Sequence, residues 1–289
     1  MSILVNRDTR VLVQGITGRI GRVQTKWMLD YGTNIVAGIT PGKGGQEVEN
    51  IPVYDTIAEA VTEQGAQASV ILVPAAAVKG AALEAIEAGL GLIIVITERV
   101  PVHDSMEIKA RARERGVRLI GPNCPGLITP GEAKLGIMPS NVFSPGIVGI
   151  VSRSGTLSYE VSANLTAAGI GQSTMVGIGG EAVVFTGMDE VLELFAKDPA
   201  TKVVAVLGEV GGIQEEEAAR FIAAGKIDKP VVACIVGQNA PEGKRIGHPG
   251  AIIQHGMGTH QSKVKALRQA GVEVTTSPLE VVELVRRHL

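Results

Sequence analysis

One histidine lies in a segment whose composition suits phosphoryl transfer. His248 follows Lys244 and Arg245 in the run GKRIGHPGA, where three glycines surround it. Small neighbours leave an imidazole accessible, and two preceding cations attract phosphate. Imidazole is a competent nucleophile when a second group fixes its tautomer, so we predict that His248 is catalytic. The remaining histidines lack such surroundings and are interpreted as structural or surface residues: His103, His255, His260 and His288.

A carboxylate is available to orient that imidazole. Glu209 stands in the run GEVGG, directly after a β-branched segment at 203–207 that predicts a buried parallel strand. Folds built on parallel strands place their sites at the carboxyl ends of those strands. Glu209 is therefore a candidate for the group that fixes the tautomer of His248.

A predicted helix N-terminus supplies a site for an anion. Ser154, Gly155 and Thr156 open a helix predicted over 155–168, directly after a strand predicted over 147–151. The free N–H groups and the dipole of such a helix end attract phosphate. An ordinary N-cap serine would explain Ser154 equally well if the segment stood alone. The candidate nucleophile in the same half of the chain favours phosphate binding.

A glycine-rich turn near the start of the chain forms another candidate anion site. Residues 14–21, QGITGRIG, connect a strand predicted at 11–13 to a helix, so their N–H groups can approach an anion. The spacing is GxxGxxG and not the dinucleotide spacing GxGxxG. NAD enzymes place a carboxylate at the end of the next strand, whereas this chain has Lys43 in TPGKGG. A lysine favours a phosphorylated ribose, which leaves NADP and coenzyme A as candidates.

Strands and helices are predicted to alternate almost throughout, which is typical of βαβ units with parallel sheets. The first half holds predicted strands at 11–13, 35–36, 69–73, 92–96 and 117–120, with helices at 75–88 and 106–115. The second half holds strands at 147–151, 173–176, 203–207 and 231–236, with helices at 155–168, 189–197, 215–224, 262–270 and 278–288. The run GPNCPGLITP separates the halves and predicts two α/β domains, 1–123 and 124–289.

Composition excludes several classes of function. The formal net charge is −2, so no overall attraction to nucleic acid or to an anionic membrane is expected. No apolar run reaches the roughly 18–20 residues needed to cross a bilayer, and the start MSILVNRDTR lacks the apolar core of a secretory signal. Cys124 and Cys234 form no metal-ligand pattern. We predict a cytoplasmic protein without a metal site of its own.

The motifs, taken in order along the chain, resemble those of the α subunits of succinate–CoA ligases (succinyl-CoA synthetases). The matching blocks are VQGITG, AGITPGKGG, ITE, GPNCPG, VSRSGTLSYE, GIGG, GEVGG and GKRIGHPGAII. The resemblance covers essentially the whole chain. It implies a Rossmann-like CoA-binding domain followed by a flavodoxin-like, doubly wound ligase domain. It also implies a nucleotide-driven acid–CoA ligase that works through a phosphohistidine and an acyl phosphate.

The resemblance also assigns roles by matching position. His248 would carry the phosphoryl group, Glu209 would hydrogen-bond to it, and Tyr159 would touch the acid substrate. The residues that would contact CoA are Thr17, Gly18, Arg19, Ile20, Lys43, Ile96, Thr97 and Glu98.

A partner subunit is implied as well. The sequence contains no Walker A motif, zinc pattern or serine-hydrolase elbow, so we expect the phosphoryl donor to bind to another subunit. In the family that the chain resembles, a β subunit supplies an ATP-grasp site for ATP or GTP with Mg²⁺. The expected acid is succinate, with malate or citrate as alternatives.

The chain departs from the family pattern in four places, namely residues 19–24, Arg99, residues 181–188 and Pro249. Two other interpretations therefore stay open. An NADP-dependent reductase would use the first glycine turn but would leave the second half unexplained. A non-catalytic CoA-binding regulatory subunit is favoured by the altered segment 181–188, whereas retention of His248 argues against it.

Overall fold

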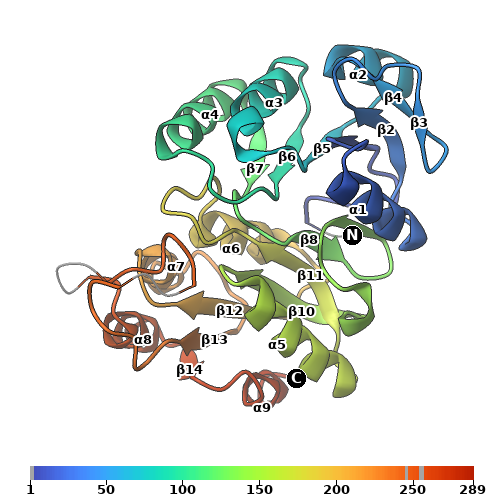
Figure 1. The fold of residues 1–289 in the computed structure, drawn as a ribbon. Helices are drawn as coiled ribbons and strands as arrows, with labels where there is room; N and C mark the ends of the chain where they lie inside the picture. The colour runs from blue at the N-terminus through green and yellow to red at the C-terminus, as the bar shows by residue number, and fades with distance from the viewer. Residues whose placement is uncertain (1–2, 245–246, 254–256) are drawn as a thin grey trace.

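The protein consists of two stacked α/β halves, each built around one sheet. The computed structural model describes residues 3–244, 247–253 and 257–289. Within these residues the strands form two seven-stranded sheets. In Figure 1 the blue-to-cyan first half lies above the green-to-red second half. The predicted alternation of strands and helices is confirmed.

The first sheet has the strand order of a doubly wound nucleotide-binding fold. Its strands are β1 (Val11–Gln14), β2 (Ile35–Ile39), β3 (Glu47–Val48), β4 (Ile51–Tyr54), β5 (Ala68–Ile71), β6 (Leu92–Val95) and β7 (Arg118–Ile120). They lie in the order β3-β4-β2-β1-β5-β6-β7, and only β3 is antiparallel to its neighbour. Without β3, the six parallel strands follow the order 3-2-1-4-5-6, which places a ligand site between β1 and β5.

The second sheet is also doubly wound, but it has the flavodoxin-like strand order. Its strands are β8 (Gly126–Thr129), β9 (Ala133–Gly136), β10 (Pro145–Ser152), β11 (Gln172–Gly177), β12 (Val203–Glu209), β13 (Val231–Val236) and β14 (Glu273–Thr275). The order is β14-β13-β12-β10-β11-β8-β9, with β8 and β9 forming an antiparallel hairpin at one edge. The five parallel strands therefore follow the order 2-1-3-4-5, whose switch point lies between β10 and β12.

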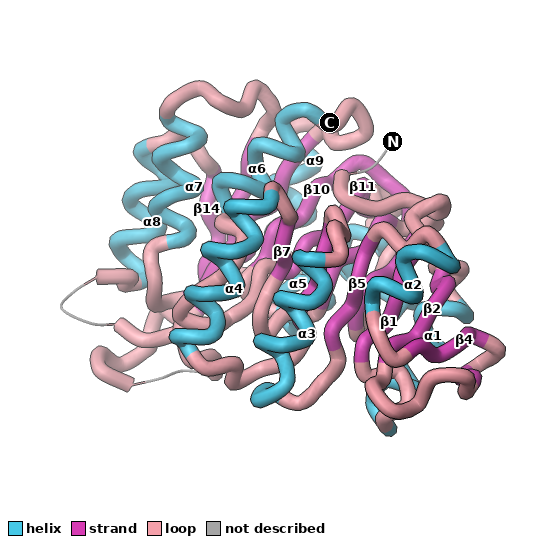
Figure 2. The backbone as a smooth tube through the Cα atoms, turned by 90° about the horizontal axis from the view of Figure 1, so that it is seen from above, coloured by secondary structure: helices cyan, strands magenta, loops and turns pink. Residues whose placement is uncertain are grey.

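Helices cover both faces of each sheet (Figure 2). In the first half α1 (Arg19–Asp30) packs on one face, while α2 (Ile57–Gln64), α3 (Ala75–Glu87) and α4 (Val102–Arg115) pack on the other. In the second half α5 (Gly155–Ala167) and α9 (Val281–Arg286) share a face, opposite α6 (Met188–Lys197), α7 (Gln214–Ala223) and α8 (His260–Gln269). A short 3-10 helix, η1, spans Ser140–Val142. This double cover explains why the central strands β1, β5, β11 and β12 are buried along their whole length.

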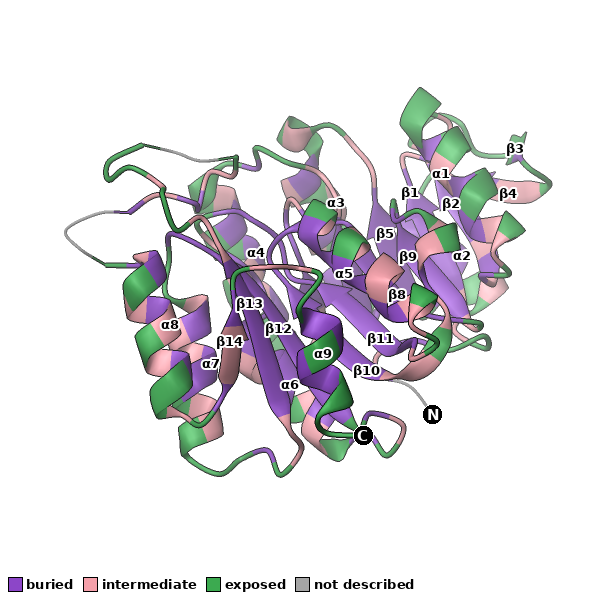
Figure 3. Cartoon of the chain, turned by 90° about the horizontal axis from the view of Figure 1, so that it is seen from below, coloured by how far each residue is buried: buried purple, intermediate pink, exposed green. Residues whose placement is uncertain are grey.

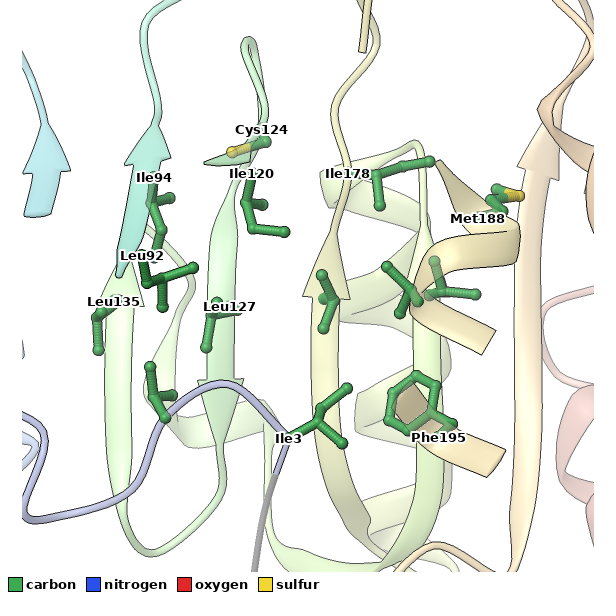
Figure 4. Packing of buried hydrophobic residues seen from close by; sticks show 14 of the residues in the cluster. Ile3, Leu92, Ile94, Ile120, Cys124, Leu127, Leu135, Ile178, Met188 and Phe195 are labelled. Atoms are coloured by element: carbon green, nitrogen blue, oxygen red, sulfur yellow. The ribbon is translucent and has the colours of Figure 1, made fainter. Parts of the chain in front are cut away.

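The cores are mostly aliphatic, in line with an aromatic content of only 3%. All seven residues of β12 are buried, and the buried strands appear purple in Figure 3. One apolar cluster joins the two halves, because Ile94 and Ile120 belong to it together with Leu127 and Leu135 of the β8–β9 hairpin (Figure 4). Burial of such a shared apolar surface holds the two sheets against each other.

The connection between the halves is compact. The first sheet ends at Ile120 and the second begins at Gly126, and the domain boundary between residues 123 and 124, which stays a prediction, falls in this connection. Gly121 has φ +102, and a Cβ there would lie 2.3 Å from the carbonyl oxygen of Val95. Only glycine therefore lets the chain pass so close to β6. Among the described residues, no helix has the length and apolarity that a bilayer crossing requires.

Candidate active site

His248 and Glu209 lie in direct contact at the carboxyl edge of the second sheet. Nδ1 of His248 is 2.7 Å from Oε1 of Glu209, the last residue of β12. The histidine side chain is 26% exposed and the glutamate side chain 11%, so the pair is sheltered but the imidazole is reachable. The structure thus brings the predicted nucleophile and the predicted orienting group together. Their catalytic roles stay predictions.

The imidazole rests on a glycine of the segment that follows β11. A Cβ added to Gly180 would lie 2.4 Å from Cγ of His248, so the ring packs directly against the Gly180 backbone. The amide of Gly250 also donates to the Gly180 carbonyl at 2.9 Å, which ties the histidine segment to the same residue. The absence of a side chain at position 180 therefore creates the space that the imidazole occupies.

The surroundings raise the pKa of His248 above its ordinary value. The largest cause is the hydrogen bond to Glu209, which stabilises the protonated ring, whereas partial burial acts in the opposite direction. The charges of Glu209 and Glu181 raise this pKa further, and that of Arg153 lowers it. With the Glu209 carboxylate accepting the proton on Nδ1, the neutral ring keeps its lone pair on Nε2. Nε2 is therefore the nitrogen that can attack an electrophile.

The predicted anion site lies beside this pair. Helix α5 begins at Gly155, and Oγ of Ser154 caps it by accepting from the amide of Leu157 at 3.3 Å. Ser154 thus serves as an ordinary N-cap, and Thr156 at the same helix end is exposed. Because β10 pairs with both β11 and β12, this helix end opens between β12, which ends at Glu209, and the segment after β11 that carries Gly180. Such a position suits an anion that His248 would carry.

Tyr159 lies one turn into α5, behind the anion site. Its ring is partly buried and meets the ring of Phe143 edge-on, with centroids 6.5 Å apart. Burial raises the pKa of Tyr159 to about 12, so its hydroxyl stays protonated at neutral pH. A protonated hydroxyl can donate to a substrate carboxylate, but no contact within the chain tests this predicted role.

A cavity of about 600 Å³ lies at the switch point of the first sheet. Its lining comes from the loops after β1, β2 and β5 and includes Gly15, Thr17, Gly18, Thr40, Pro41, Val73 and Pro74. Gly21 allows this arrangement, because a Cβ there would lie 2.1 Å from the carbonyl oxygen of Gly15. The volume and the polar glycine turn suit the nucleotide part of a ligand such as CoA.

The other predicted CoA contacts lie around this cavity without lining it. Arg19 and Ile20 are exposed in the first turn of α1, and Lys43 is exposed in the loop after β2. The amides of Lys43 and Gly44 donate to Asp55, which fixes that loop while leaving the lysine side chain in solvent. Beyond the end of β6 lie Ile96, Thr97 and Glu98, of which Thr97 donates to the carbonyl of Val73. These contacts stay predictions.

The chain is similar over its whole length to proteins of known family. Family models described as a CoA binding domain and a CoA-ligase match residues 6–99 and 151–273. The succinate–CoA ligase (ADP-forming) subunit alpha 2 of Archaeoglobus fulgidus is 55% identical over 285 residues, which cover 99% of both chains. The corresponding subunit alpha of Aquifex aeolicus is 52% identical over 291 residues, covering 100% of this chain and 95% of the relative. The chain belongs to the family of succinate–CoA ligase α subunits.

A solved structure extends this relationship to a larger enzyme. A mutant ATP citrate lyase of Methanosaeta concilii, in complex with (3S)-citryl-CoA, matches with a TM-score of 0.89 at 28% identity. The match covers 99% of this chain but 50% of that chain, so the α subunit spans about half of the lyase. The two-sheet arrangement is therefore found both in a separate subunit and within a longer polypeptide.

The segment 181–188, where this family member departs from the expected pattern, joins the two halves beside His248. Oε1 of Glu181 accepts from the amide of Arg99 at 3.0 Å and from the side chain of Asn123 at 3.2 Å. Thr186 donates to a carbonyl of β7, and Phe185 packs into the core of the first half. Segment 181–188 therefore has a structural role here, and the anchor at Arg99 sits next to the predicted CoA residues 96–98.

Two residues of the site escaped sequence reasoning. Gly180 belongs to the GIGG block, but which of its glycines supports the imidazole depends on the folded path of a segment that starts some 70 residues later. Arg153 is fully buried against Glu209, although arginine is usually exposed. Its position directly after a predicted strand and directly before the Ser154 anion site was the available signal.

Proposed function

We propose that this chain is the α subunit of a nucleoside-triphosphate-dependent succinate–CoA ligase that acts through a phosphohistidine at His248. The observation that carries the proposal is the 2.7 Å contact between His248 and Glu209 at the switch point of the ligase-like half. The full-length similarity to curated succinate–CoA ligase α subunits supports the same assignment. A β subunit with an ATP-grasp fold would supply ATP or GTP, and the complex would work in the cytoplasm.

The first step forms a nitrogen–phosphorus bond on this chain. Nε2 of neutral His248 attacks the terminal phosphorus of the triphosphate, and the bond to the nucleoside diphosphate breaks. Glu209 holds the Nδ1 proton and balances the positive charge that develops on the ring. Mg²⁺ bound with the nucleotide on the partner would offset the phosphate charges during this step.

The next steps consume the phosphohistidine. A carboxylate oxygen of succinate attacks the phosphorus, and the bond to Nε2 breaks to give succinyl phosphate and neutral His248. The CoA sulfur then attacks the acyl carbon and the bond from that carbon to the phosphate oxygen breaks. The thiol proton leaves with the departing phosphate, giving succinyl-CoA and inorganic phosphate. The N–H groups at the start of α5, Gly155 and Thr156 among them, would hold the phosphoryl oxygens through these transfers.

The direct test of this proposal locates the phosphate. The chain, assembled with its β subunit, is incubated with ATP and digested under mildly basic conditions, because phosphohistidine is lost in acid. Mass spectrometry is expected to find one phosphate on the peptide that contains His248, and its loss on addition of succinate with CoA. Phosphate on a different residue would refute the proposal. Replacing succinate by malate or citrate in the second incubation identifies the acid.

Lys43 gives a separate prediction for the CoA site. The Lys43→Ala substitution is expected to weaken CoA binding about 10-fold, because a charge-assisted contact to the ribose 3′-phosphate is lost. Binding of 3′-dephospho-CoA is expected to stay unchanged, since this ligand lacks the phosphate. Isothermal titration calorimetry measures both constants in the assembled complex, and NADPH is titrated in parallel to test the reductase alternative.

The matched control for this experiment is Lys26→Ala. Lys26 lies on α1 of the same half and pairs at 3.3 Å with Asp30. The Lys26→Ala substitution should leave the affinities for CoA and for 3′-dephospho-CoA unchanged. An equal loss of CoA and 3′-dephospho-CoA affinity in Lys43→Ala would contradict the assignment of Lys43 to the 3′-phosphate.

A further inference from the structure

A network of buried charges lies directly behind Glu209. Arg153 follows β10 with its side chain 2% exposed, and Nη2 lies 3.8 Å from Oε1 of Glu209, the atom that contacts His248. Nη1 donates to the backbone carbonyls of Glu209 and Gly211, at 3.3 and 2.6 Å. One guanidinium therefore holds both the carboxylate of Glu209 and the backbone on either side of Val210.

Two further buried charged residues, Glu215 and Lys263, hold the Arg153 guanidinium in place. Glu215 is fully buried in the first turn of α7; its Oε1 accepts from Nη1 of Arg153 at 3.4 Å and from the Glu209 amide at 3.1 Å. Lys263 of α8, also fully buried, pairs with the Glu215 carboxylate and donates to the Gly212 carbonyl at 3.1 Å. Burial alone would raise the pKa of Glu215, but Arg153 and Lys263 outweigh it and hold that pKa below its ordinary range.

The Glu209–His248 pair has no positive charge of its own while the imidazole is neutral, and Arg153 supplies one. A carboxylate buried beside a neutral imidazole has no positive partner, so it would turn toward water. A Glu209 carboxylate that turned toward water could no longer accept the Nδ1 proton in a fixed direction. Arg153 supplies a permanent positive charge, and the planar fork of arginine adds a fixed geometry that lysine would lack.

We propose that Arg153 is a positioning residue for phosphoryl transfer: it keeps the Glu209 carboxylate aimed at Nδ1 of His248. This inference rests on the proposed phosphohistidine chemistry. It assigns to Glu215 and Lys263 the supporting role of holding Arg153 and the turn at Gly211 and Gly212. Because Arg153 also immediately precedes Ser154, one residue sets the spacing between the orienting carboxylate and the phosphate-binding end of α5.

The test is a double-mutant cycle on the assembled complex. Arg153→Met is expected to slow phosphorylation of His248 by ATP about 30-fold. Loss of a residue that orients another site residue typically lowers activity by about 10- to 100-fold. In a Glu209→Gln background the same change is expected to alter the rate less than about 2-fold, because Arg153 acts through Glu209. Rapid-quench measurement of labelled phosphate on the chain gives all four rates. Losses that multiply in the double variant would overturn the proposal.

NMR spectroscopy reports on the position of Glu209 without any catalytic turnover. In the full chain labelled with ¹⁵N-histidine, the hydrogen-bonded Nδ1 proton of His248 is expected at low field in NMR spectra. It should be lost in Arg153→Met. If the wild type carries no phosphate on His248, the proposed function fails, yet this signal still decides the role of Arg153. An unchanged signal in Arg153→Met would overturn that role.

The matched control removes a different buried cation. Lys134 of β9 is 1% exposed and donates to the carbonyl of Met138 at 3.1 Å, away from the His248 site. Lys134→Met is expected to keep the phosphorylation rate within about 2-fold and to keep the His248 signal. An equal loss of phosphorylation rate in Lys134→Met would overturn the proposal, because general destabilisation would then explain the effect of Arg153→Met. Should Arg153→Met fail to fold, Glu215→Gln carries the same measurements, with a smaller expected loss.

Discussion

The His248→Asn substitution is expected to abolish phosphorylation of the chain and to lower succinate- and ATP-dependent turnover by at least about 10⁴-fold, the scale of loss when a covalent nucleophile is removed. A carboxamide nitrogen has no free lone pair with which to attack phosphorus. Asparagine is smaller than the imidazole and fits the space above Gly180, so the fold should persist. Rapid-quench labelling and a coupled assay of CoA consumption measure the two losses in the assembled complex.

The control for this substitution is another histidine that contacts a glutamate. Nε2 of His288 lies 3.2 Å from Oε1 of Glu273 on the surface, so His288→Asn removes a similar pair far from the β12 edge. Full labelling and turnover are expected there. CoA affinity should also be unchanged in His248→Asn, because the CoA cavity lies in the other half of the chain. Phosphate that remains on the His248→Asn chain would refute the assignment of the nucleophile.

The contact between His248 and Glu209 could be anticipated from sequence although the residues are 39 positions apart. Glu209 ends a predicted parallel strand, and parallel strands bring their carboxyl ends to one edge of a sheet. His248, which is flanked by glycines, can act with Glu209 only if its segment approaches that edge. Local periodicity also predicts the alternation of strands and helices, whereas the two doubly wound folds are implied only by the family resemblance.

Other features depend on tertiary contacts that periodicity does not encode. Strand β8 lies within residues 121–130, whose prolines and glycines indicate only a domain junction, and the four residues of β9 that follow at Ala133–Gly136 show no strand periodicity of their own. The position of Arg153 between a predicted strand and Ser154 is a signal, but it does not by itself tell a buried arginine from an exposed one. Its role becomes visible only when Glu209 and Glu215 are seen on either side of it.

The Gly180→Ala substitution is expected to slow phosphorylation of His248 by about 100-fold, the scale of loss when a reacting group is displaced by about 1 Å. The φ angle of Gly180 lies outside the left-handed region, so alanine causes no backbone strain. Its methyl group, however, would lie 2.4 Å from Cγ of His248 and 2.7 Å from Cδ2. The imidazole must then move away from Glu209, while the Gly250 amide still ties its segment to the Gly180 carbonyl.

Two measurements separate this displacement from general damage. Gly91→Ala serves as the control, because its φ is also outside the left-handed region and the nearest atom to an added Cβ is the Gln67 carbonyl oxygen at 4.0 Å. Both variants should melt close to the wild-type temperature, but only Gly180→Ala should lose phosphorylation and the low-field Nδ1 proton. A Gly180→Ala chain that is phosphorylated at the normal rate would mean that His248 reacts from a different position. The contact with Glu209 would then be a resting arrangement and not the one from which the phosphoryl group is accepted.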